Sequence, residues 1–256
     1  MIKARTTAWR TVLGGLKRSY SIVLLLAIWE AAVRFGIAPS ILLPAPSAVA
    51  LALVRDLGDA HYLSDLALTL YRLFTGLVIA IGGGVLIGIG AAQSRLGPLV
   101  LEPTIRVLSP LPKIVFFPAF LLLLGFGSAP RIVLVVIDAI FPALLAAYFG
   151  ARAIDEKLVW SARAAGMSPF ACVFRVVLPA ALPGILTGVR IAIVIGCVVV
   201  FLSEMVAPGD GLGDALIRAA RGFQTVQMYV PLVTISLLGL LLDYAVVRVQ
   251  STLVNW

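Results

Sequence analysis

The chain has 256 residues, of which 61% are hydrophobic and only 12% are charged, and its mean hydropathy is +1.10. Because a soluble domain has about 25% charged residues, this composition leaves too little polar surface for a water-soluble protein. The formal net charge of +8 does not indicate nucleic-acid binding, since the basic residues flank apolar runs as they do in membrane proteins.

Apolar runs divide the chain into six expected membrane-spanning helices, which approach the roughly 20 residues needed to cross a bilayer. They cover about residues 21–35, 66–92, 99–124, 131–151, 181–206 and 229–249. Prolines at positions 103, 110, 112 and 118 interrupt the third. The sequence therefore predicts an all-α polytopic membrane protein. A transmembrane domain, residues 21–256, follows a cytoplasmic segment, residues 1–20.

The segment between the first two spans, residues 37–65, is expected to be a loop with a short helix after "LPAPS". Pro44 and Pro46 favour an extended lead-in, and Ser47 is a candidate N-cap for that helix. The basic and then apolar start of the chain also fits a signal peptide. No small-residue cleavage pattern follows, so an uncleaved first helix is expected.

Lysines and arginines indicate orientation, because cytoplasmic flanks of spans carry an excess of them. With six spans, both termini lie on one side together with Arg95, Arg248 and the polar loop 154–178. The first flank on that side contains Lys3, Arg5, Arg10, Lys17 and Arg18. Aspartates dilute the arginines on the opposite side. We expect both termini and the loop to be cytoplasmic, in the inner membrane of a bacterial cell.

The loop of residues 154–178 has the signals of two short helices joined by a turn. Asp155 can cap the first helix, and Gly166 suits a left-handed helix end. Ser168 and Pro169 are typical of the N-cap and first position of a second helix, and Pro179 is expected to mark the start of the fifth span. The small residues at the tip would allow another backbone to approach closely, which indicates a partner.

This loop resembles the cytoplasmic EAA loop of ABC importer permeases. That pattern is Glu-Ala-Ala, three residues, Gly, nine residues, Ile, one residue, Leu-Pro. Aligning Gly166 places Ala162 on the third position, Val176 on the Ile and Leu178-Pro179 on the Leu-Pro. Trp160 and Ser161 replace the usual Glu and Ala. The segments "LPAPSAV", "LSPLPKIVFFPAFLLLLGFG" and "SEMVAPGDGLG" resemble the subfamily that imports nitrate, sulfonates and taurine.

The resemblance implies a type I importer permease fold with a cytoplasmic coupling helix. It implies three kinds of partner in addition to membrane lipid: a dimer of ABC ATPases, a second permease copy and an extracytoplasmic substrate-binding protein. ATP and Mg would be bound by the ATPases, and this chain would hold no cofactor. The implied ATPase contacts are Ala162, Arg163, Ala164, Ala165, Gly166, Met167 and Ser168.

Charged residues at membrane depth are costly and tend to face a cavity or a partner. The candidates for a path that attracts a small anionic solute are Arg106, Lys113, Asp138 and Arg190. Structural explanations stay open: Glu102 and Arg106 are one turn apart on a helix, and Arg72 and Arg190 can snorkel from near a boundary. A path without an unpaired base would argue against an anionic solute.

On the outer side, Glu204 and the "PGDGLG" turn with Gly211 and Gly213 are candidates for a gate where the binding protein docks. Ordinary turn chemistry explains the glycines equally well. In "GGGVLIGIG", Gly84 and Gly88 form a small-residue face for helix packing, and the chain has no phosphate-loop lysine.

An enzyme is the weakest class, because one histidine and two distant cysteines do not form a metal site and no nucleophile motif is present. Two other functions stay open: a secondary transporter or channel that uses Asp138 and Asp243, and a membrane scaffold. The 154–178 loop distinguishes these two hypotheses from an ABC permease, because the loop has a role only if an ATPase docks on it.

Overall fold

The computed structural model describes residues 20–253, and their secondary structure is helical throughout. Within this range four helices are long and apolar enough to cross a membrane: α3 (Ala60–Gln93), α6 (Ser128–Arg152), the continuous run Pro169–Val206 and α11 (Thr225–Leu253). A broken pair of helices supplies a fifth span. A shorter helix, residues 20–34, precedes them. The basic flank of Lys3 to Arg18 lies outside the described residues.

The short helix predicted after "LPAPS" is α2 (Pro46–Asp56). The prediction that Ser47 caps it is wrong, because Ala45 is the N-cap residue and makes no side-chain cap. Ser47 instead lies inside the first turn, where its backbone N–H and hydroxyl both donate to the Glu30 carboxylate, at 3.0 and 2.7 Å. A free first-turn N–H needs an acceptor, and Glu30 supplies it from the preceding helix.

Helices α3 and α6 form the centre of the molecule and run parallel to one another. The small-residue face predicted on α3 packs here. A Cβ on Gly84 would lie 2.8 Å from the Ile140 carbonyl oxygen, and one on Gly88 would lie 2.5 Å from that of Leu144. The two backbones therefore approach so closely that only glycine fits at these positions.

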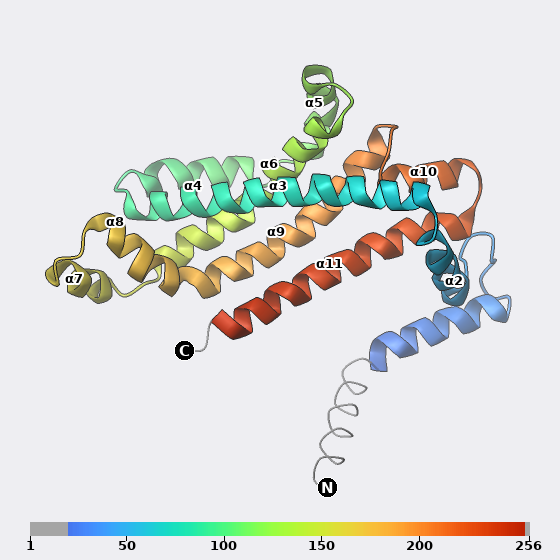
Figure 1. Ribbon diagram of the computed structural model, residues 1–256, viewed down its shortest axis with the longest axis horizontal. Coiled ribbons are helices and arrows are strands. Elements are labelled where there is room, and N and C mark those ends of the chain that lie inside the picture. Colours follow the sequence, from blue (N-terminus) through green and yellow to red (C-terminus); the bar gives the residue numbers. More distant parts are fainter. Residues whose placement is uncertain (1–19, 254–256) are drawn as a thin grey trace, which may run out of the picture.

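The third span is broken as its prolines predict. It consists of α4 (Gly97–Leu108), the 3₁₀ turn η1 (Lys113–Phe116) and α5 (Phe117–Leu124), and its two halves meet at 78°. Pro110 and Pro112 lie in the gap, where they remove donors that a continuous helix would need. In Figure 1 α4 lies beside α3, while α5 projects away from the bundle.

The 154–178 loop contains α7 (Glu156–Ala164) and α8 (Pro169–Cys172), followed by the π turn η2 (Val173–Val177) and α9 (Leu178–Val206). Pro179 lies in the first turn of α9, as expected for the start of the fifth span, although α8, η2 and α9 succeed one another without a gap. The wider hydrogen-bond ring of a π turn accommodates a local fault in the ladder, and Pro179, which lacks an N–H, comes directly after it.

The chain ends with α10 (Leu212–Arg221) and α11, whose described end is Leu253. Figure 1 shows α7 and α8 at one end of the elongated molecule and α2 and α10 at the other, with α11 running from the α10 end toward the α7 side. The core between α3, α6 and α9 contains Leu73, Ala80, Leu134, Ala139 and Val200, all fully buried. This packing fixes the two ends of the molecule relative to each other.

Candidate functional site

The 154–178 loop has the predicted helix–turn–helix geometry. The Asp155 carboxylate caps α7 by accepting from the Lys157 N–H at 2.9 Å. Gly166 has φ +83°, and the N–H groups of Gly166 and Met167 donate to the carbonyls of Arg163 and Ala162 at 3.0 and 3.1 Å. This is a Schellman ending, in which glycine avoids the strain of a left-handed backbone. The turn is therefore fixed by its own hydrogen bonds.

The tip of this loop is open to solvent. Arg163, Ala164, Ala165, Gly166 and Ser168 are exposed, while Ala162 and Met167 are half-buried. The Ser168 hydroxyl caps α8 by accepting from the Ala171 N–H at 3.3 Å.

Large apolar side chains surround the tip, with Leu158, Trp160 and Phe170 at 53, 63 and 75% exposure. Trp160 replaces the usual glutamate of the EAA pattern. Its exposure places an apolar side chain where that pattern has a charge.

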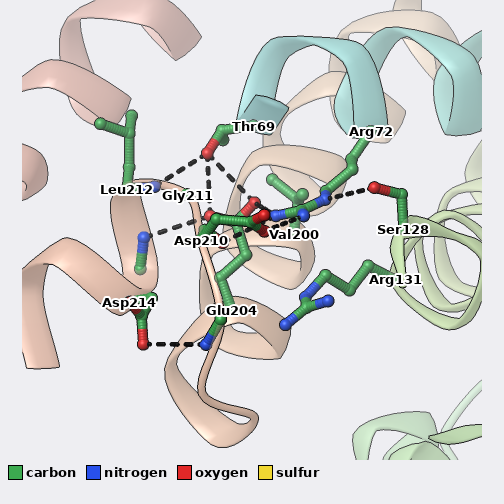
Figure 2. Close-up of polar contacts among 12 residues, drawn as sticks. Thr69, Arg72, Ser128, Arg131, Val200, Glu204, Asp210, Gly211, Leu212 and Asp214 are labelled. Atoms are coloured by element: carbon green, nitrogen blue, oxygen red, sulfur yellow. Dashed lines mark hydrogen bonds and ion pairs between the residues drawn. The ribbon is translucent and has the colours of Figure 1, made fainter. Parts of the chain in front are cut away.

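A buried polar cluster joins α3, α6 and α9 at the opposite end of the molecule (Figure 2). Glu204 on α9 is fully buried and accepts from Arg72 Nη1 at 2.7 Å, from the Thr69 hydroxyl at 2.9 Å and from the Gly213 N–H at 3.1 Å. Arg72 also donates to the Ser128 hydroxyl and pairs with the Asp210 carboxylate. The expectation that Arg72 snorkels is wrong, because its side chain is 2% exposed and paired.

The "PGDGLG" turn is held against this cluster by its backbone. Gly211 N–H donates to Asp65 at 2.9 Å, and Leu212 N–H donates to Thr69 at 2.9 Å. Gly211 has φ +108°, and a Cβ there would lie 2.4 Å from Glu204 Cδ. The predicted gate residues Glu204, Gly211 and Gly213 therefore lie together. Here the glycines allow a close approach; their role in gating stays a prediction.

Further charged residues extend the cluster, and their partners were not predicted. Arg218 bridges the carboxylates of Asp65 and Asp214. Arg131, 1% exposed, donates to the carbonyls of Phe126, Gly127 and Ala207 at 2.8 to 3.1 Å. These residues were interpreted only as charges flanking the spans. The one available signal was that Arg72 and Glu204 both fall at membrane depth in the sequence. Their pairing could not be predicted, because they lie on helices far apart in the chain.

Lys113 and Asp138, two candidates for the path, pair with each other at 3.1 Å. Lys113 Nζ also donates to the carbonyls of Ser109 and Leu111, both at 3.3 Å, and lies 4.7 Å from the centroid of the Phe141 ring. Lys113 therefore satisfies carbonyls that the break between α4 and α5 leaves open. This geometry accounts for a buried lysine without a solute.

Arg106 is exposed and has no ion-pair partner within residues 20–253. The expected pairing of Glu102 with Arg106 is wrong: Glu102 accepts from the Tyr148 hydroxyl at 3.0 Å and pairs with Arg152 at 3.5 Å. Both partners come from α6, so the Glu102 carboxylate turns toward that helix and not toward Arg106 on its own helix. Arg106 is thus the one path candidate with a free cation in the described chain.

Arg190 on α9 and Asp243 on α11 form a bidentate ion pair, with Nε and Nη2 donating to the two carboxylate oxygens at 2.6 and 3.1 Å. The expectation that Arg190 snorkels freely is wrong. Both side chains remain partly open, at 39 and 31% exposure. They line a cavity of about 570 Å³ between the two helices. Residues 20–253 contain no group of three or more metal-ligating side chains.

A family of transport proteins matches two thirds of this chain. The model of the binding-protein-dependent transport system inner membrane component covers residues 84–254. The chain belongs to this family. It is therefore a permease subunit of an ABC importer, a multi-pass inner-membrane protein that is not itself catalytic. The prediction from the 154–178 loop is confirmed at this level.

Relatives of this permease cover almost its whole length. The putative aliphatic sulfonates transport permease protein SsuC of Bacillus subtilis is 28% identical over 95% of this chain and 88% of its own. The taurine transport system permease protein TauC of Escherichia coli is 26% identical over 92% and 88%. Among solved structures, the inward-facing methionine ABC transporter MetNI has a TM-score of 0.65, with 20% identity over 75% of this chain and 96% of that one. This likeness confirms the permease fold.

Proposed function

We propose that this permease moves a small sulfonate-like solute inward, using ATP hydrolysed by a separate pair of ATPases that dock on the 154–178 loop. An extracytoplasmic binding protein would deliver the solute, and a second copy of the chain would complete the path. ATP and Mg would be held by the ATPases alone. The solute class is supported by the sulfonate and taurine permeases among the relatives.

The exposed tip of the 154–178 loop is the single observation that carries the ATPase proposal. Its turn is rigid because caps and a Schellman ending satisfy its backbone, and nothing lies within 4 Å of a Cβ at Gly166. An exposed, pre-ordered and partly apolar projection loses little entropy when a partner covers it. The proposed ATPase contacts are residues 162–168.

The orientation proposal places both termini and this loop in the cytoplasm. In Figure 1 α11 runs from the α10 end toward the side of the molecule that carries the loop, and basic residues are more frequent on that side. Glu204, Gly211 and Gly213 then belong to the outer side, where the binding protein would dock. Arg106 and Arg190 remain proposed path residues, whereas the pairing of Lys113 with Asp138 favours a structural role for both.

The deciding experiment introduces Gly166→Arg into the tagged permease and measures membrane insertion, co-purified ATPase activity and ATP-driven uptake. We expect normal insertion with loss of both activities. Gly36→Arg is the matched control, because Gly36 has a similar φ of +74°, equally open surroundings and the same Schellman hydrogen bonds, from Gly36 N–H to Val33 O and from Ile37 N–H to Ala32 O, but belongs to another loop. Ala165→Glu should act like Gly166→Arg.

Two results would contradict the ATPase proposal. The first is a wild-type chain that never retains an ATP-hydrolysing subunit. The second is a Gly166→Arg variant that takes up solute as well as the Gly36→Arg control does. Loss of insertion in Gly166→Arg but not in the control would assign the glycine to folding instead.

A further inference from the structure

The Arg190–Asp243 pair lies at one end of the apolar hollow described above. Its cavity of about 570 Å³ follows a stripe of α9 from Arg190 to Leu202 and the facing stripe of α11 from Asp243 back to Ile235. A second hollow of about 400 Å³, with Thr187 in its lining, shares the same two charged residues. The ion pair therefore lies where the two hollows meet.

The position of this pair favours contact with a cavity or a partner over contact with lipid tails. Each residue lies at least ten positions from either end of its helix, so the pair is at membrane depth. Yet about a third of each side chain is uncovered in the single chain. Charged groups at this depth face water-filled cavities or partner protein. A cavity of this size also falls within the range of small-molecule sites, which combine apolar walls with a few polar groups.

The pairing decides which solutes this site can hold. A solute with only an anionic group can reach Arg190 through Nη1, which Asp243 leaves unused, but its charge then lies beside the like charge of the Asp243 carboxylate and is not compensated. A solute with both an anionic and a cationic group replaces both halves of the pair. Its anion binds the guanidinium and its ammonium group binds the carboxylate, so no charge is left uncompensated. The rest of the wall, which includes Val194, Val198 and Phe201, suits a short alkyl linker between the two groups.

We infer that Arg190 and Asp243 form a solute subsite that selects small zwitterions over simple anions. This inference rests on the proposed import function and narrows its substrate class. Arg190 recognises the anionic group and Asp243 the ammonium group. A solute that passes the pair moves from one of the two hollows to the other.

The test compares taurine, a zwitterionic sulfonate, with ethanesulfonate, which has the same sulfonate and a similar length but no amine. Both probes are bound to the full chain in lipid nanodiscs, together with the subunits that co-purify with it. We expect the wild type to favour taurine. Asp243→Asn, which leaves Arg190 unpaired, should lower the taurine-to-ethanesulfonate affinity ratio by roughly tenfold or more, the usual loss for a charged hydrogen bond. Glu102→Gln, in another half-exposed ion pair outside the cavity, should leave the ratio unchanged.

The ratio is measured on one preparation, so it does not depend on how much of a variant folds. The exchanged pair Arg190→Asp with Asp243→Arg keeps the attraction and should keep the preference for taurine. The inference is overturned if the wild type binds neither probe or prefers ethanesulfonate, or if Asp243→Asn changes the ratio no more than Glu102→Gln does. Retention of the ATPase is scored separately, so failure of the import proposal and failure of this inference give different results.

Discussion

Arg72 and Glu204 illustrate how single charged side chains are kept in the interior. Their side chains are 2 and 0% exposed, and five other groups complete their hydrogen bonds: Thr69, Ser128, the carboxylate and the carbonyl of Asp210, and the Gly213 N–H. Burying two ions costs more than their attraction returns unless such additional bonds are made. The cluster therefore holds α3, α6, α9 and the turn after α9 in a single arrangement.

Removing one member of this pair should be worse than removing both. Arg72→Met leaves the Glu204 carboxylate buried without its cation, a loss of about 3–5 kcal/mol. The double variant Arg72→Met with Glu204→Met should recover part of that loss, because no charge remains. Thermal unfolding of the purified chain in detergent measures both. A double variant that is no more stable than Arg72→Met alone would contradict this account.

The pairing of α3 with α6 depends on glycines at particular positions along the helix. Gly88 faces α6, where an added Cβ would lie 2.5 Å from a backbone oxygen, whereas Gly90, two residues later, has nothing within 4 Å. The same segment of α3 therefore contains one glycine that touches the α6 backbone and one that touches no other helix. The small-xxx-small spacing of Gly84 and Gly88 was visible in the sequence because helical periodicity is a local property.

Gly88→Ala and Gly90→Ala form a matched pair that tests this packing. Gly88→Ala must push the two helices apart and should destabilise the chain by about 1–3 kcal/mol, as overpacked cores do. Gly90→Ala should be neutral or slightly stabilising, since alanine favours a helix. The difference between their melting temperatures in one detergent is the measurement. Equal melting temperatures would show that the α3–α6 contact tolerates a methyl group.

At the scale of the whole molecule, the proposed topology places the 154–178 loop and the loop before α2 on opposite sides of the membrane. Single cysteines at Arg163 and Ile41 report on this, because both positions are exposed while the native Cys172 and Cys197 are buried. A membrane-impermeant maleimide should label Ile41→Cys in intact spheroplasts and Arg163→Cys only after lysis. Labelling of Arg163→Cys from outside would invert the topology and remove the ATPase proposal with it.

How much of this molecule its sequence predicts depends on the distance between interacting residues. The 154–178 loop was predictable because Asp155, Gly166 and Ser168 each act within a few positions. The partners of Arg72 and Arg190 were not, because they lie on helices far away in the chain. Ser47 was misassigned for the same reason, since Glu30 comes from another helix. The start of α9 beside Pro179 was predictable for the same local reason as the loop, whereas the π turn that joins α9 to α8 was not.

The uninterrupted run from Pro169 to Val206 has a mechanical consequence. At about 1.5 Å per residue its 38 residues form a rod of roughly 57 Å, nearly twice the hydrocarbon thickness of about 30 Å. One end belongs to the exposed projection, and Glu204 stands two residues from the other. A push applied at the tip of the 154–178 loop is therefore carried toward the far end along one continuous backbone, and the π turn and Pro183 are irregular points along it where part of the movement can be absorbed.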